Sequence, residues 1–219
     1  MNVLITGASR GIGKAAADAF LKMNYTVFSP GRDELDLSNH KSVNAFIKKH
    51  ELDFDIIINN AGVNEIALLE DISDENIKQT LQINLIAPIK LLRGLIKRMK
   101  NNRFGRIVNI GSIWAVVSKC GRMTYCASKN ALHGVSNTLA LELAPFNILV
   151  NTVCPGFTAT ELTSKNNTKE QIAEIEKNIP LGRMARPEEI AAVIAFLGSE
   201  QNTYITGQKI VADGGFAVQ

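Results

Sequence analysis

Six short apolar runs alternate along the chain with longer stretches in which apolar residues recur at helical spacing. The runs lie at residues 1–6, 25–29, 54–58, 106–111, 148–154 and 208–212. Helical periods lie at 12–23, 39–50, 74–100 and 125–143, and another helix is expected to begin at Pro187. The run at 54–58 has no polar residue after Asp55, as in a strand buried within a parallel sheet. This alternation predicts an α/β fold.

The helical period at 74–100 contains a proline. Pro88 lacks the N–H that a helix interior needs, so it should kink the helix near Asn84. An amide at a kink can hydrogen-bond a freed backbone carbonyl or a water. Asn84 is therefore a candidate for a structural or a catalytic role.

Two other segments depart from the regular alternation. The six residues after Arg32 hold no helical period, so a crossover helix is missing ahead of the helix that Ser38 is expected to cap. The polar stretch at 158–178 is helical only in part, and we expect it to act as a mobile lid over a site.

Length and composition indicate one soluble domain covering residues 1–219. Hydrophobic residues make up 46% of the chain and charged residues 21%, and the net charge of +3 is dispersed, so nucleic acid is not an expected partner. No apolar run approaches the ~18 residues that span a bilayer, and no leader is visible. Three cysteines without C-x-x-C spacing fit a reducing compartment, and the three histidines form no metal signature. We expect a cytoplasmic protein without a membrane partner or a metal.

A glycine-rich loop joins the first strand to the first helix. Gly11, Gly13 and Ala16 follow Gly7 in the G-x-G-x-x-G/A spacing of dinucleotide-binding loops. Such a loop directs backbone N–H groups and the positive end of a helix dipole at one spot, and its glycines let a diphosphate come close. A plain tight turn is the alternative interpretation.

The end of the second strand bears on which dinucleotide binds. An acidic residue there binds the ribose hydroxyls of NAD, whereas an arginine accommodates the extra phosphate of NADP. Arg32 follows this strand and Arg10 lies in the glycine loop, which favours NADP. Asp33 and Glu34 keep NAD open, or are solvated charges of a turn.

A hydroxyl, a phenol and an amine lie within the segment 112–129. Tyr125 and Lys129 are four residues apart, so a helix places them on one face, where the ammonium would favour the phenolate and lower the tyrosine pKa. Ser112 follows an apolar run, at a carboxyl edge where open α/β sheets bind ligands. Tyr-x-x-x-Lys also occurs by chance in helices, so the pair alone does not establish catalysis.

With these residues assembled, the chain resembles the short-chain dehydrogenases/reductases over nearly its whole length, and is similar to their 3-oxoacyl-[acyl-carrier-protein] reductase branch. Six motifs occur in the family's order. They are Thr6-Gly7-x-x-x-Gly11-x-Gly13, Asn59-Asn60-Ala61-Gly62, Asn84, Ser112, Tyr125-x-x-x-Lys129 and Pro155-Gly156.

The resemblance implies a Rossmann-like, doubly wound parallel sheet with helices on both faces, and an NAD(P)-dependent oxidoreductase that commonly forms a tetramer. By motif position, Tyr125 is the general acid in reduction, Ser112 binds the substrate oxygen, Lys129 lowers the tyrosine pKa, and Asn84 holds a water that passes protons to Lys129. The cofactor-binding residues implied are Gly7, Ser9, Arg10, Gly11, Ile12, Gly13, Arg32, Asp36, Leu37, Asn60, Ala61, Gly62, Tyr125, Lys129, Pro155, Gly156 and Thr160.

Two features depart from the family pattern or lie outside it. Family members usually have a helix before the segment that meets adenine, here Asp36 and Leu37, so the adenine pocket must differ. Trp114 and Arg122 could bind a substrate carboxylate or phosphate; the alternative is a packing Trp and a surface Arg.

Three functions are compatible with these residues. The first is an NADP-preferring oxidoreductase for a carbonyl or alcohol, possibly a carrier-linked 3-oxoacyl thioester or a sugar-derived ketone, in a homo-oligomer (dimer or tetramer). The second is a non-catalytic NAD(P)-sensing binding protein on the same fold. The third is a nucleotide-sugar epimerase or dehydratase, but that group has a different glycine spacing and a larger carboxyl-terminal substrate lobe.

Overall fold

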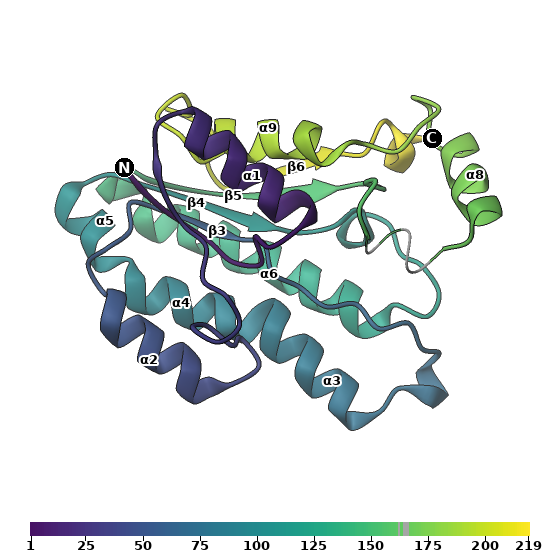
Figure 1. Cartoon of the computed structure of the whole chain (residues 1–219), viewed down its shortest axis with the longest axis horizontal. Coiled ribbons are helices and arrows are strands. Elements are labelled where there is room, and N and C mark those ends of the chain that lie inside the picture. Colours follow the sequence, from purple (N-terminus) through teal and green to yellow (C-terminus); the bar gives the residue numbers. More distant parts are fainter. Residues whose placement is uncertain (162, 164–166) are drawn as a thin grey trace.

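The strands form one parallel sheet (Figure 1). The computed structural model describes residues 1–161, 163 and 167–219. Within these, the strands are β1 (Asn2–Ile5), β2 (Thr26–Phe28), β3 (Ile56–Asn59), β4 (Gly105–Ile110), β5 (Ile148–Pro155) and β6 (Lys209–Ala212). Their order is β2-β1-β3-β4-β5-β6, and every neighbouring pair is parallel. All carboxyl ends therefore lie at one edge, and the predicted α/β fold is confirmed.

Helices cover both faces of this sheet (Figure 1). One face is covered by α1 (Gly11–Lys22) and α9 (Pro187–Leu197), which pack side by side. The other is covered by α2 (His40–His50), α4 (Ala87–Leu95) and α6 (Met123–Leu143). The remaining longer helices are α3 (Asp74–Leu81), α5 (Lys97–Asn102) and α8 (Lys169–Lys177).

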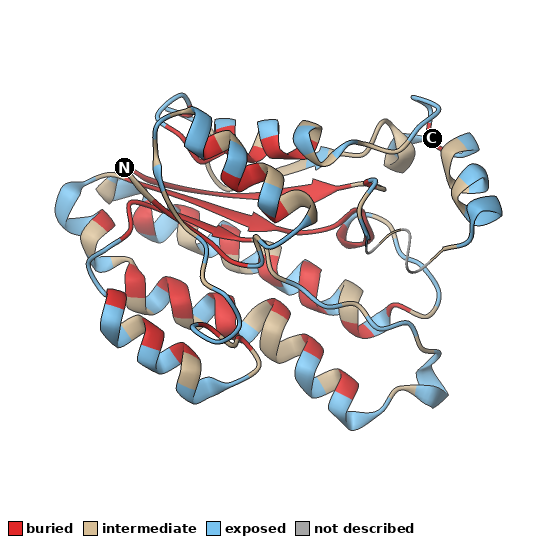
Figure 2. Ribbon diagram, in the orientation of Figure 1, coloured by how far each residue is buried: buried red, intermediate tan, exposed pale blue. Residues whose placement is uncertain are grey.

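The apolar side chains of the strands from β1 to β5 divide between two cores. In β3, Ile56 and Ile58 pack into the core beneath α1 and α9, whereas Ile57 packs toward α2 and α4. This alternation follows from the two-residue period of a strand. Every residue of β3, β4 and β5 is buried, which Figure 2 shows as continuous red arrows. The central strand predicted at 54–58 is therefore confirmed, although β3 begins at Ile56 and ends at Asn59.

At the position of the expected kink the structure has a π-helical segment. After α3 the chain runs through Gln82–Ile86 as a π-helix that contains Asn84, and α4 begins at Ala87 with Pro88 in its first turn. A π-turn shifts the hydrogen-bond pattern by one residue, so the N–H that Pro88 lacks is not required.

The segment after β2 contains turns and no helix until His40, as the sequence predicts. The predicted cap is wrong: Asn39, not Ser38, caps α2, because its Oδ1 accepts the N–H groups of Lys41 and Ser42. Ser38 instead donates its N–H and its hydroxyl to Asp36, at 2.9 and 2.7 Å.

Part of the polar stretch at 158–178 can be compared with its prediction. It contains α8 within the described residues, and the expected lid also includes 162 and 164–166, which lie outside them. Its mobility stays a prediction. Among the described residues, no helix combines the length and the apolar character needed to cross a bilayer.

Candidate active site

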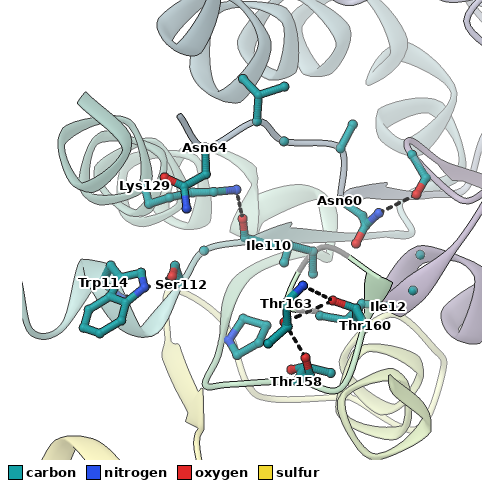
Figure 3. Close-up of a pocket in the computed structure, with 18 of the residues that line it drawn as sticks. Ile12, Asn60, Asn64, Ile110, Ser112, Trp114, Lys129, Thr158, Thr160 and Thr163 are labelled. Carbon is teal, nitrogen blue, oxygen red and sulfur yellow. Dashed lines mark hydrogen bonds between the residues drawn. The ribbon is translucent and has the colours of Figure 1, made fainter. Parts of the chain in front are cut away.

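A cavity lies at the carboxyl ends of β1 and β3, where the sheet changes its winding direction. The chain leaves β1 toward β2 on one side, and leaves β3 toward β4 on the other. Ligands of open α/β sheets bind at such a divergence. The cavity has a volume of about 410 Å³, and residues from the ends of β1, β3, β4 and β5 line it (Figure 3).

The glycine loop is held closely against the end of β3. Gly7 has φ +67°, and a Cβ there would lie 2.8 Å from the Cα of Ala61. A Cβ on Gly13 would collide with the Asn60 amide and the Gly7 carbonyl. Asn60 Nδ2 donates to the carbonyls of Thr6 and Gly7, at 3.0 and 2.9 Å. Glycine is therefore needed here for close approach as well as for backbone conformation.

These loop residues fit the diphosphate of a nicotinamide dinucleotide. The loop lies at the N-terminus of α1, whose first turn carries no acidic residue. Unpaired N–H groups at a helix start attract an anion, and the missing side chains leave the backbone open to it. Arg10 lines the same cavity and pairs with Glu161 at 3.2 Å.

The predicted serine, tyrosine and lysine come together on one side of this cavity. Ser112 follows β4, and Tyr125 and Lys129 lie in the first two turns of α6. The Ser112 side chain is close enough to Tyr125 to lower the pKa of its phenol. Lys129 Nζ lies 5.7 Å from the centre of the tyrosine ring.

The pKa of Tyr125 is raised in the structure, whereas the sequence predicts that it is lowered. Burial raises the pKa of Tyr125, and the Ser112 side chain and the Arg122 charge offset this only in part. Lys129 is not among the groups that lower this pKa, and its ammonium donates to the Ile110 carbonyl at 2.7 Å (Figure 3). Burial also lowers the pKa of Lys129 from 10.5 to about 8. Lys129 therefore stays mainly protonated at neutral pH but releases its proton more readily than an exposed lysine.

Asn84 has a structural role in the segment that follows β3. Its Oδ1 accepts the Val63 N–H, and its Nδ2 donates to the Val63 carbonyl, both at 2.9 Å. Nδ2 also donates to Ser128 Oγ at 3.1 Å. Asn84 thus connects the π-helix, the loop after β3 and α6. The water predicted at Asn84 stays a prediction.

Most of the predicted site residues line the cavity. These are Gly7, Ser9, Arg10, Gly11, Ile12, Gly13, Asn60, Ala61, Gly62, Ser112, Tyr125, Lys129, Pro155, Gly156 and Thr160.

Four predicted residues lie outside the lining. Asn84 lies behind the lining residue Gly62, and its Oδ1 lies 3.4 Å from where a Cβ of Gly62 would be. Arg32 and Asp36 form an ion pair at 3.6 Å, and neither residue lines the cavity. Leu37 is buried in the core, and its carbonyl accepts a hydrogen bond from Gln82.

Several lining residues were not assigned as site residues from the sequence. Val63, Asn64 and Phe157 follow strand ends, where a simple extension of the neighbouring motifs would have included them. Thr158, Glu161, Thr163 and Asn167 come from the polar stretch and carry no motif. Trp114 and Arg122, which the sequence offered as possible binders of a substrate carboxylate or phosphate, also line the cavity, and both are only 9% exposed. The interpretation of Arg122 as a surface residue is therefore wrong.

Comparisons with known proteins agree with this geometry. A model of the short-chain dehydrogenases/reductases, described as "Enoyl-(Acyl carrier protein) reductase", matches residues 33–217. The 3-oxoacyl-[acyl-carrier-protein] reductase FabG of Rickettsia felis is 39% identical over 97% of this chain and 95% of its own. The FabG of Haemophilus influenzae is 35% identical over 97% and 96%.

Solved structures give the same result. A 4-hydroxyisoleucine dehydrogenase complexed with NADH superposes with a TM-score of 0.92 at 32% identity, covering 99% of this chain and 98% of the other. A protein proposed to be an NAD(P) dependent gluconate 5-dehydrogenase, from Beutenbergia cavernae with bound NADP, gives 0.94 at 30% identity, covering 100% and 97%. The glycine loop, the Ser-Tyr-Lys set and these likenesses together establish that the chain belongs to the short-chain dehydrogenase/reductase family, as an NAD(P)-dependent oxidoreductase acting on CH–OH or C=O groups.

Proposed function

We propose that the chain is an NADP-preferring reductase of a polar carbonyl compound, such as a 3-oxoacyl thioester or a sugar-derived ketone. The observation that carries the proposal is that Ser112, Tyr125 and Lys129 line one cavity with the glycine loop. The names of the FabG relatives support a thioester, which would be carrier-linked. The gluconate dehydrogenase-like structure supports a sugar-derived ketone.

In the proposed reaction the three side chains act on the substrate oxygen. Bound NADPH supplies the hydride. Ser112 and Tyr125, which line the same cavity, bind the carbonyl oxygen, and Tyr125 donates its proton to that oxygen. The Lys129 ammonium, with a pKa of about 8, resupplies the proton, and Asn84 would hold a water beside Gly62 that connects to it.

The remaining predicted residues would hold the cofactor. The glycine loop and Thr160 would surround the diphosphate and nicotinamide, since Thr160 Cγ2 lies 3.3 Å from where a Cβ of Gly11 would be. Asn60, Ala61 and Gly62 would line the cleft. Asp36 and Leu37 would meet the adenine from beyond the cavity.

The preference for NADP rests on two exposed arginines. The side chains of Arg10 and Arg32 are 66% and 81% exposed, and each pairs with a single carboxylate. A 2′-phosphate carries more charge than a carboxylate and can compete for both guanidinium groups. Replacing Arg32→Ala should weaken NADPH binding about tenfold and leave NADH binding unchanged, measured by cofactor fluorescence. Equal effects on the two cofactors would contradict the preference.

We also propose that α4 and α6 form the interface of a homo-oligomer. A groove between them is lined by Ile89, Leu92, Ile96, Val135 and Leu139, and its floor is mainly apolar. An apolar groove on the surface favours association. Light scattering should give the mass of a dimer or a tetramer. The mass of one chain at micromolar concentration would refute this assembly.

One experiment tests the proposed activity. NADPH and NADH are titrated against the purified chain by fluorescence, and a panel of carbonyl compounds is then screened for loss of reduced cofactor. We expect cofactor binding, and turnover with at least one polar carbonyl. Binding without turnover on any carbonyl or alcohol would favour a cofactor-sensing protein.

A further inference from the structure

Arg122 is a buried cation without a partner in the described part of the chain. Only 9% of the residue is exposed, and it lines the cavity beside Tyr125. Its Nε is completely covered and has no hydrogen-bond partner, and no salt bridge reaches the side chain among the described residues. Burial lowers the pKa of Arg122, and arginine still remains charged. An uncompensated buried charge is costly unless something neutralises it.

The surroundings of Arg122 are aromatic and positively charged. Its guanidinium lies 5.8 Å from the centre of the Trp114 ring, and Lys119 Nζ lies 5.6 Å from the same centre. Trp114 packs edge-on against Phe157, which also lines the cavity. These side chains form an apolar wall with a cation set in it.

The positive charge of Arg122 lies at the opposite end of the cavity from the glycine loop, where the cofactor phosphates would bind. Figure 3 shows Ser112 and Trp114 at one end of the cavity, with Ile12 and Asn60 of the phosphate-binding region at the other. Among the described lining residues the only acid is Glu161, which is paired with Arg10 at the loop end. Nothing described at the Trp114 end balances Arg122.

We propose that Arg122 binds a carboxylate of the substrate, which makes the substrate an oxo acid. The inference rests on the proposed function. Arg122 lies three residues before Tyr125 and lines the same cavity, so a carboxylate bound by Arg122 belongs to the same substrate molecule as the carbonyl that Tyr125 acts on. A guanidinium offers a planar pair of donors that matches the two oxygens of a carboxylate. An acyl thioester is neutral at this distance from its carbonyl and leaves Arg122 without a counter-charge.

Matched substrates test this directly. Rates of NADPH oxidation are measured with acetoacetate, with its neutral methyl ester and with its N-acetylcysteamine thioester. Because a hydrogen bond to a charged group contributes about 1.5–3 kcal/mol, kcat/KM for the acid should exceed that for the ester by about 10- to 100-fold. Equal kcat/KM values for acid and ester in the unmodified protein would overturn the proposal.

Two variants locate the preference at Arg122. Arg122→Gln should bring the acid-to-ester ratio close to one, and Arg122→Lys should restore it in part. Lys119→Gln removes the same charge from the same indole, but from an exposed side chain, and should keep the ratio within about twofold. An unchanged ratio in Arg122→Gln would overturn the role of this residue.

A binding measurement keeps the inference separate from turnover. Trp114 is the only tryptophan in the chain, so intrinsic fluorescence reports on this wall. Titration with acetoacetate in the presence of NADP⁺ should give a saturable change that the ester does not give and that Arg122→Gln abolishes. Reduction of the neutral esters without such a change would refute the oxo-acid inference and leave the proposed function intact. Acid binding without any turnover would refute the function alone.

Discussion

Lys129 gives a prediction whose sign and size follow from burial. The residue is 3% exposed, and its pKa falls from 10.5 to about 8 in the folded chain. Between these values the unfolded chain binds more protons at Lys129 than the folded chain does. The free energy of unfolding therefore rises with pH in this window. Replacing Lys129→Met keeps the length of the side chain and removes the titration.

The size of the effect follows from the two pKa values. The difference between 10.5 and about 8 corresponds to about 3 kcal/mol of destabilisation at neutral pH. About 2 kcal/mol of this is recovered between about pH 7.5 and about pH 9.5. Below the folded pKa the full cost is present, because both states then carry the proton.

Urea unfolding at these two pH values measures the effect. The unmodified chain should gain about 2 kcal/mol more than Lys129→Met as the pH rises. Lys48→Met, which removes an exposed lysine of α2, controls for the loss of a charge and should follow the unmodified chain. Parallel changes in the unmodified chain and Lys129→Met would show that the buried amine carries no such cost.

Two further substitutions test the loop and the π-helix. Gly13→Ala should raise the dissociation constant for NADPH about tenfold or more, because the new methyl displaces the amide whose two hydrogen bonds, each about 1 kcal/mol, hold the loop. The control is Gly94→Ala, whose new methyl collides with Ile47; it should cost about 1–3 kcal/mol of stability and leave the NADPH affinity unchanged. Weaker NADPH binding in Gly94→Ala but not in Gly13→Ala would contradict the role of the glycine loop in cofactor binding. Asn84→Ala should lower the free energy of unfolding in urea by about 2–4 kcal/mol, through the lost bonds to Val63, and a loss below about 0.5 kcal/mol would contradict its structural role.

The site was largely predictable because parallel strands end at one edge. Gly7, Asn60 and Ser112 each follow an apolar run, and parallel pairing of these runs brings the three together. The motif spacing identified the cavity wall without any knowledge of side-chain contacts.

The features that were missed depend on tertiary contacts or on competing local bonds. Ser38 does not cap α2, because the carboxylate of Asp36 takes its N–H and hydroxyl. The i, i+4 spacing placed Lys129 near Tyr125, but it did not indicate that Ile110 would accept the ammonium proton. The burial of Arg122 follows from packing against Trp114, which no periodicity reveals.

The central claim is that Tyr125 protonates an oxygen while the nicotinamide delivers hydride to the attached carbon. The most direct measurement uses NADPH deuterated at the reactive carbon, and follows deuterium into the alcohol product by mass spectrometry, for the unmodified chain and Tyr125→Phe. One deuterium per product is expected in the unmodified chain. Tyr125→Phe should bind NADPH with unchanged affinity and transfer almost none. Full deuterium transfer by Tyr125→Phe would contradict the account.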